Sequence, residues 1–144
     1  KRDVLDFYDC FTVGESPLTT ADIALQYVTE GPDQVLDEMI AFSHMEAACF
    51  MIDMVQLPFN LVKMKRAFSD WQYKLAGRGW NALYIENHDH PRIISRYGNE
   101  AYRNESGKML AAMYMLQRGT PFIYQGQEIG MTLTPDDIHI MHKS

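Results

Sequence analysis

Cysteine, positive charge and long apolar runs are all scarce in this sequence. The two cysteines, Cys10 and Cys49, fit no CxxC or other metal-binding spacing, so we expect free, partly buried thiols, as in a reducing cytosol. The 13 basic residues are outnumbered by 19 acidic ones, and the net charge of −6 argues against a nucleic-acid partner, whose phosphates attract a basic face. No apolar stretch approaches the roughly 20 residues that span a bilayer. No signal peptide is visible at the N-terminus, so we predict a cytoplasmic protein with no membrane partner.

What remains is the composition of one ordinary globular domain. The chain has 144 residues, of which 47% are hydrophobic and 22% are charged. These values exclude disordered and collagen-like classes, and the length suffices for one domain but not for two. No internal repeat or low-complexity segment interrupts the sequence.

Short apolar runs alternate with longer amphipathic segments along the chain. The runs that predict strands are residues 10–13, 39–42, 82–85 and 121–124. The segments that predict helices are residues 19–27, 61–76 and 102–117. In the clearest of these helices, apolar residues recur at steps of three and four, which gathers them in one stripe. Strands that alternate with helices in this way predict an α/β fold with a parallel sheet and helical crossovers.

Each predicted strand runs into a polar residue that could carry chemistry. Glu15, Asp89 and Glu128 follow three of the strands, and His44 follows the remaining one. In parallel α/β folds, functional groups gather at the carboxyl ends of the strands. We interpret Glu128, which lies in a glycine-containing turn, as structural, and take Glu15 and Asp89 as the candidates for chemistry.

Glu15 admits two interpretations. A carboxyl at the mouth of an apolar sheet is suited to act as a general acid, because burial disfavours its charged form. The other interpretation is an ordinary solvated carboxylate in a loop between Gly14 and Pro17. Position alone leaves both open.

Asp89 lies in the stretch NHDHPR, which follows the third predicted strand. A carboxylate held by Asn87, His88 and Arg92 would stay ionised and accept hydrogen bonds from sugar hydroxyls. The alternative is a structural salt bridge from Asp89 to Arg92 or Arg96. The residue types in this stretch therefore indicate substrate binding without excluding a purely structural role.

The pair His88 and His90 raises the question of a metal site. A His-x-His pair after a strand can hold zinc, but a closed site needs two more ligands, and His44 is the only obvious third one. If the strand continued through the pair, the two rings would point to opposite faces of the sheet. His139 and His142 lie in a polar tail. We therefore expect no metal and keep a metal-dependent hydrolase as an alternative.

Several segments are similar, in order and spacing, to the C-terminal part of the barrel of the α-amylase superfamily (glycoside hydrolase family 13). They are residues 12–15, 68–72, 80–83, 87–92, 95–98, 105–106, 108–111 and 119–131. The branch that the chain resembles most contains oligo-1,6-glucosidases, dextran glucosidases and trehalose-6-phosphate hydrolases. The resemblance implies a partial (β/α)8 TIM barrel, about strands five to eight, in residues 1–132, and leaves residues 133–144 as an unassigned tail.

The resemblance also implies roles for individual residues. Glu15 would be the acid/base, and Asp89 would be the carboxylate that stabilises the transition state. The enzyme would be a retaining α-glucosidase that removes terminal α-linked glucose from short oligosaccharides, with α-1,6 links favoured. His88, Asn87 and Arg92 would bind the sugar, and neither a cofactor nor a metal is implied.

The sequence departs from the resemblance at several points. His90 stands where many of these α-glucosidases have glutamine, and Gln127 stands where glutamate is common. The nucleophilic aspartate of the family precedes the part that is matched here, and a complete barrel takes at least about 250 residues. We therefore predict that the chain is the second half of a barrel and is inactive alone. Unpaired sheet edges near Cys10 and Tyr124 predict a partner, either the missing N-terminal half or a second copy. A third interpretation is a non-catalytic chain that binds sugar or a partner.

Overall fold

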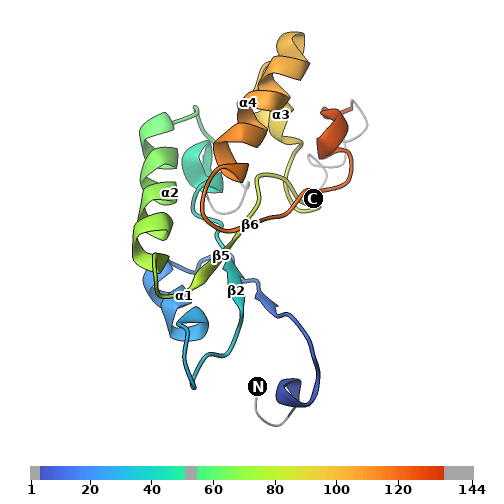
Figure 1. Cartoon of the computed structure of the whole chain (residues 1–144). Helices are drawn as coiled ribbons and strands as arrows, with labels where there is room; N and C mark the ends of the chain where they lie inside the picture. Colours follow the sequence, from blue (N-terminus) through green and yellow to red (C-terminus); the bar gives the residue numbers. More distant parts are fainter. Residues whose placement is uncertain (1–3, 51–54, 135–144) are drawn as a thin grey trace.

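The computed structural model describes residues 4–50 and 55–134. Its main sheet has four strands in the order β1-β2-β5-β6, and every neighbouring pair is parallel (Figure 1). The strands are β1 (Val13–Gly14), β2 (Glu38–Ile40), β5 (Trp80–Leu83) and β6 (Thr120–Pro121). A separate antiparallel pair consists of β3 (Cys49–Phe50) and β4 (Val55–Gln56). The predicted α/β class with a parallel sheet is confirmed.

The helices lie mainly in the crossovers between the strands. The α-helices are α1 (Ala21–Val28), α2 (Leu61–Leu75), α3 (Ile93–Tyr97) and α4 (Arg103–Met115). The 3-10 turns are η1 (Leu5–Phe7), η2 (Met45–Ala47), η3 (Glu100–Tyr102) and η4 (Gln127–Ile129). In Figure 1, α1 and α2 lie to the left of the strands, and α3 and α4 lie above them.

Local signals in the sequence account for the two helices that precede β2 and β5. The Thr20 side chain accepts a hydrogen bond from the Ile23 N–H at the start of α1, and Asn60 Oδ1 accepts one from the Lys63 N–H at 2.9 Å at the start of α2. Gly77, with a φ of 68°, ends α2 in the left-handed region. The helix predicted at residues 102–117 is η3 followed by α4, whereas α3 and the β3–β4 pair were not predicted.

β1, β2 and β6 are shorter than predicted, and β5 has the predicted length but begins two residues earlier. Only Val13 of the predicted run 10–13 lies in β1, because both the N–H and the hydroxyl of Thr12 donate to Asp37 Oδ2, at 2.7 and 2.6 Å. In β6, Pro121 has no N–H to donate to a neighbouring strand. Pairing with β5 nevertheless continues one residue further, where the Phe122 N–H donates to the carbonyl of Leu83 at 2.7 Å.

Helices cover one face of the sheet, and the other face is partly exposed, since Glu38 and Ala82 on that face are buried. On the covered face, one core cluster joins Met39 of β2 and Ala41, which directly follows β2, to α1 and α2. A second cluster joins Leu83 of β5 to α3 and α4. Because side chains alternate along a strand, Val13 and Trp80 point to the opposite face, where they are 37% and 38% exposed. Within the described residues, β1 and β6 are the edge strands of this sheet.

Two predictions on cysteines and the tail have different outcomes. Cys10 is a free thiol, but the prediction that it is partly buried is wrong, because η1 and the segment before β1 leave it exposed. The Cys49 side chain and most of the unassigned tail, residues 135–144, lie outside the described residues. Among the helices that the structure describes, none combines the length and the apolar character needed to cross a membrane.

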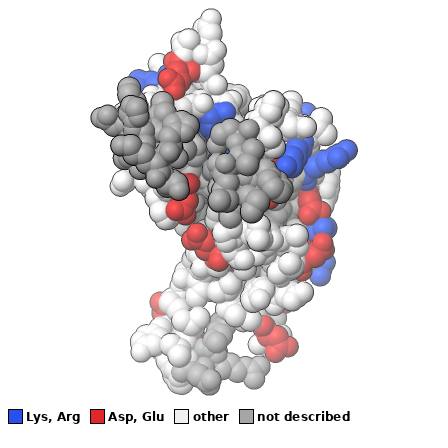
Figure 2. Space-filling model, turned by 180° about the vertical axis from the view of Figure 1, so that it is seen from behind, with Lys and Arg blue, Asp and Glu red and all other residues white. Residues whose placement is uncertain are grey.

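Figure 2 shows acidic side chains interspersed with the basic ones on the visible face.

Candidate active site

The order of the strands brings Glu15 and Asp89 to one edge of the sheet. Glu15 directly follows β1, and Asp89 lies in the loop that follows β5. β1 and β5 flank β2, and all three strands are parallel, so their carboxyl ends meet at the same edge. Both side chains are exposed. The two carboxylates therefore leave the sheet on the same side, with one strand between them.

A pocket of about 400 Å³ lies around Asp89. Its lining comes from the loop 87–92, from Tyr124 after β6 and from residues 131, 133 and 134. Four of the five predicted site residues line this pocket, and they are Asn87, His88, Asp89 and Arg92. Glu15 is not part of the lining and lies at the end of β1.

Asp89 is held by its neighbours within the loop. Its N–H donates to Asn87 Oδ1 at 2.9 Å, and its Oδ1 lies 3.4 Å from His88 Nε2. The side chains of His88 and Asp89 are 71% and 51% exposed, so the polar tip of the loop faces the open pocket. This arrangement leaves a carboxylate and an imidazole accessible to a polar ligand.

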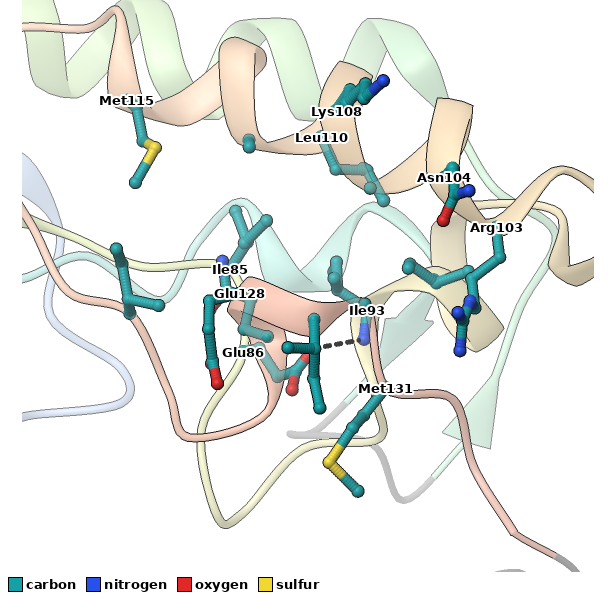
Figure 3. A pocket seen from close by; sticks show the side chains of 17 residues that line it. Ile85, Glu86, Ile93, Arg103, Asn104, Lys108, Leu110, Met115, Glu128 and Met131 are labelled. Atoms are coloured by element: carbon teal, nitrogen blue, oxygen red, sulfur yellow. Dashed lines mark hydrogen bonds between the residues drawn. The ribbon is translucent and has the colours of Figure 1, made fainter.

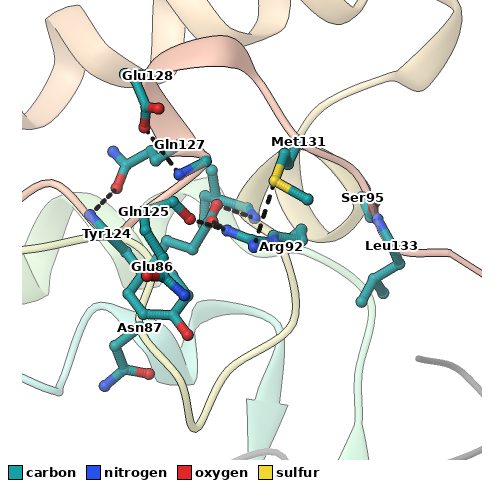
Figure 4. A network of polar contacts seen from close by, with 12 residues as sticks. Glu86, Asn87, Arg92, Ser95, Tyr124, Gln125, Gln127, Glu128, Met131 and Leu133 are labelled. Carbon is teal, nitrogen blue, oxygen red and sulfur yellow. Dashed lines mark hydrogen bonds and ion pairs between the residues drawn. The ribbon is translucent and has the colours of Figure 1, made fainter.

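Arg92 does not hold Asp89 as the sequence suggested. Its guanidinium pairs with Glu86, whose side chain is 1% exposed, and it donates to the carbonyl of Gln125 at 2.8 Å (Figure 4). The guanidinium also lies 5.1 Å from the centre of the Tyr124 ring. Sequence reasoning missed Glu86, although a second carboxylate directly after a buried strand was a visible signal.

The turn after β6 is organised by its own side chains. Gly126, with a φ of 89°, donates its N–H to Glu128 Oε2 at 2.8 Å, and the Tyr124 N–H donates to Gln127 Oε1 at 3.2 Å (Figure 4). Gln127 Nε2 donates to the Tyr114 hydroxyl at 3.0 Å, which fastens the turn to α4. The structural interpretation of Glu128 agrees with these contacts, since it holds its own turn.

The three histidines considered as metal ligands have different surroundings. His44 is buried between Phe68, whose ring stacks on it at 5.0 Å, and Tyr84. Burial lowers the pKa of His44 to about 3, so the ring is neutral near pH 7. His90 is also buried, and its Nε2 lies 3.0 Å from the Tyr84 hydroxyl, whereas His88 is exposed. Among the described residues, no three His, Cys, Asp or Glu side chains gather closely enough to hold a metal ion.

A second pocket, of about 480 Å³, lies between α4 and η4. Figure 3 shows Leu110 and Met115 of α4 along one side of it and Glu86 and Glu128 on the other. None of the predicted site residues lines this pocket. Met131 lines both pockets, and Glu86 of this pocket pairs with Arg92 of the loop around Asp89.

Glu38 is a further buried carboxyl that sequence reasoning did not single out. It opens β2 and has no exposed surface. Burial raises the pKa of Glu38, and the charge of Asp37 adds to this shift. Its position at the start of the strand separates it from the edge where Glu15 and Asp89 lie.

Comparison with known proteins gives concordant matches along the chain. It is 46% identical over 140 residues to an oligo-1,6-glucosidase of Heyndrickxia coagulans, a match that covers 90% of this chain and 24% of the relative. It is also 46% identical over 132 residues to the trehalose-6-phosphate hydrolase of Bacillus subtilis, covering 90% of this chain and 23% of the relative. The crystal structure of the Bacillus licheniformis trehalose-6-phosphate hydrolase matches with a TM-score of 0.82 at 41% identity, over 91% of this chain and 24% of that one.

The chain therefore spans about a quarter of the length of these relatives. The sequence profile of the alpha-amylase catalytic domain matches residues 1–143. Together with the parallel sheet and the loop around Asp89, these matches confirm the resemblance found in the sequence. The chain belongs to the alpha-amylase catalytic-domain family of glycoside hydrolases.

Proposed function

We propose that this chain is the C-terminal part, about strands five to eight, of the (β/α)8 TIM barrel of a retaining α-glucosidase. The observation that carries the proposal is that two carboxylates, Glu15 and Asp89, follow parallel strands at one edge of a sheet, with a polar pocket around the second. The names of the relatives, oligo-1,6-glucosidase and trehalose-6-phosphate hydrolase, support an enzyme that acts on short α-glucosides.

In this proposal the two carboxylates have different roles. Glu15 gives its proton to the glycosidic oxygen as the bond to the sugar carbon breaks, and it later accepts a proton from the attacking water. Asp89 stays ionised, accepts hydrogen bonds from sugar hydroxyls and stabilises the positive charge of the oxocarbenium-like transition state. His88, Asn87 and Arg92 line the pocket and would contact the sugar or support groups that do so.

A retaining glycosidase also needs a nucleophilic carboxylate about 5–5.5 Å from the acid. We place that group in a part of the protein outside residues 1–144, and the isolated chain is therefore inactive in this proposal. Val13 and Trp80 are partly exposed on the sheet face opposite the helices, and β1 and β6 are edge strands. Both features support a partner surface for the missing N-terminal half of the barrel or for a second copy. The free thiol of Cys10 supports a cytoplasmic location.

The linkage preference is the finer part of the proposal. The two curated relatives named above have the same identity to this chain, although one is named for α-1,6 links and the other for a phosphorylated disaccharide. We favour α-1,6-linked oligosaccharides as substrates. Hydrolysis of isomaltose and of trehalose 6-phosphate by the full-length protein would distinguish the two.

The central experiment replaces the proposed acid in the full-length protein. Because general acid–base catalysis contributes about 10²–10⁴-fold, Glu15→Gln should lower kcat on isomaltose by that order. It should lower the rate of the first step less on p-nitrophenyl α-glucoside, whose leaving group needs little protonation. The matched control is Glu30→Gln, an exposed glutamate after α1 at the opposite end of the strands, which should leave both rates unchanged.

Four results would contradict the proposal. Equal activity of the Glu15→Gln and wild-type proteins would show that Glu15 is not the general acid. Turnover by the isolated chain that disappears in Glu15→Gln would show that the missing half is not required. Loss of wild-type activity in the presence of a chelator would favour the metal-dependent hydrolase, and sugar binding without turnover would favour a non-catalytic member of the family.

A further inference from the structure

The loop that carries His88 and Asp89 is closed at its base by a buried ion pair. Glu86 precedes the loop and Arg92 ends it, and Glu86 Oε1 accepts a hydrogen bond from Arg92 Nη1. The other oxygen of Glu86, Oε2, accepts the Ile93 N–H at 2.9 Å, at the first turn of α3 (Figure 3). One carboxylate therefore fixes both the end of the loop and the start of the following helix.

Arg92 extends the same contact to the turn after β6. Its guanidinium donates to the Gln125 carbonyl at 2.8 Å and contacts Met131 Sδ at 3.6 Å, and it lies over the Tyr124 ring (Figure 4). Gly126 lies so close that an added Cβ would be 3.3 Å from Arg92 Nη1. Glu86 and Arg92 thus join the two loops that follow β5 and β6, and both loops line the pocket around Asp89.

Because the Glu86–Arg92 ion pair is buried, neither side chain can easily exchange its partner for water. The side chains of Glu86 and Arg92 are 1% and 17% exposed, so water competes little for either of them. Removing one partner would leave the other with an uncompensated buried charge. The loop would then relax to find another partner, and the groups at its exposed tip, His88 and Asp89, would move with it.

We infer that Glu86 is a positioning residue, which acts through Arg92 to hold Asp89 in place for transition-state stabilisation and does not touch the substrate. This inference rests on the proposed function for the role of Asp89. Because the proposed interaction of Asp89 strengthens in the transition state, its displacement lowers kcat more than it raises KM.

The test uses the full-length protein and two single variants, Glu86→Gln and Arg92→Lys. Glu86→Gln keeps the shape and an acceptor for the Ile93 N–H but removes the charge, and Arg92→Lys keeps the charge but cannot reach Glu86 and Gln125 together. Each should lower kcat by about 10²-fold, the loss expected from a displacement of about 1 Å, with little change in KM. Since the two residues act as a unit, the double variant should be no slower than the slower single variant.

The control removes an ion pair that lies away from the loop. Asp22 and Lys74 join α1 to α2 with 2.6 Å between their charged atoms, and Asp22→Asn should leave kcat unchanged. Wild-type kcat in folded Glu86→Gln, or an increase in KM alone, would overturn the inference, because the first would deny a positioning role and the second would indicate direct binding of substrate.

A second measurement keeps the inference separate from the proposed function. Hydrogen exchange at the amides of His88, Asp89 and His90 should be faster in Glu86→Gln than in the wild type, whether or not the protein hydrolyses α-glucosides. Unchanged exchange would overturn the inference even if the protein is an α-glucosidase. Faster exchange in a protein without α-glucosidase activity would support the role of Glu86 in holding the loop and would refute only the proposed function.

Discussion

Two glycines with almost the same φ angle offer a controlled test of the packing between β5 and β6. Gly119 precedes β6 with a φ of 149°, and Gly31 follows α1 with a φ of 146°. A Cβ added at Gly119 would lie 2.5 Å from the Asn81 carbonyl oxygen and 2.7 Å from Leu83 Cγ, whereas a Cβ at Gly31 would meet nothing within 4 Å. Alanine at either position is strained, but only at Gly119 does it also collide with a backbone group.

The two costs can be separated by magnitude. Backbone strain in this region of φ is worth about 1–3 kcal/mol, and overpacking adds about 1–3 kcal/mol. Gly31→Ala should therefore lower the free energy of unfolding by about 1–3 kcal/mol, and Gly119→Ala by about 2–6 kcal/mol. The Asn81 carbonyl belongs to β5, so it cannot swing aside as the end of a flexible side chain can.

The assay is urea unfolding of the protein that contains this chain, followed by circular dichroism. The quantity to compare is the difference in the free energy of unfolding between Gly31→Ala and Gly119→Ala, because the backbone strain that both variants share cancels in it. Equal losses of stability in Gly31→Ala and Gly119→Ala would refute the reasoning, because they would show that β6 shifts without cost. A shift of β6 would also move Gln125 away from Arg92, so Gly119→Ala should lower kcat as well.

Two further predictions concern pH. The pKa of Glu38 is raised by burial, so the unfolded chain releases this proton at lower pH than the folded one, and stability is lost as pH rises from about 4.5 through the raised value. Glu38→Gln should therefore have a higher Tm than the wild type at pH 7 and a similar Tm at pH 4; the reverse order would indicate a cationic partner. The pKa of His44 is lowered to about 3, so stability falls as pH decreases from 6.5, by up to about 1.4 kcal/mol per pH unit. His44→Phe should flatten this dependence in urea unfolding, and an unchanged slope would contradict the assignment.

Local chemistry was enough to predict the main elements. The apolar stripe of α2 and the glycine at position 77 predicted a helix over residues 61–76, which ends within one residue of the observed helix. Alternation of apolar runs with such helices predicted the parallel sheet, because a helical crossover returns the chain to the same edge. The segments shared with the α-amylase superfamily predicted the family.

Long-range contacts decided what local sequence could not. The stretch 86–92 offered Arg92 two nearby carboxylates, and sequence alone did not say which of them it would bind. The structure pairs it with Glu86, because Glu86 is buried three residues after β5 and accepts the Ile93 N–H of α3, while Asp89 lies at the exposed tip of the loop. The burial of His44 against Phe68 of α2, 24 positions further along the chain, likewise could not be predicted from local patterns.

The sequence by itself determined the class of fold, the family and the identity of the polar residues that follow each strand. Only the tertiary structure decided which of those residues face a pocket and which hold the scaffold. The physical reason is that periodicity and capping depend on neighbours in the chain, whereas burial and ion pairing depend on which distant side chains compete for the same group.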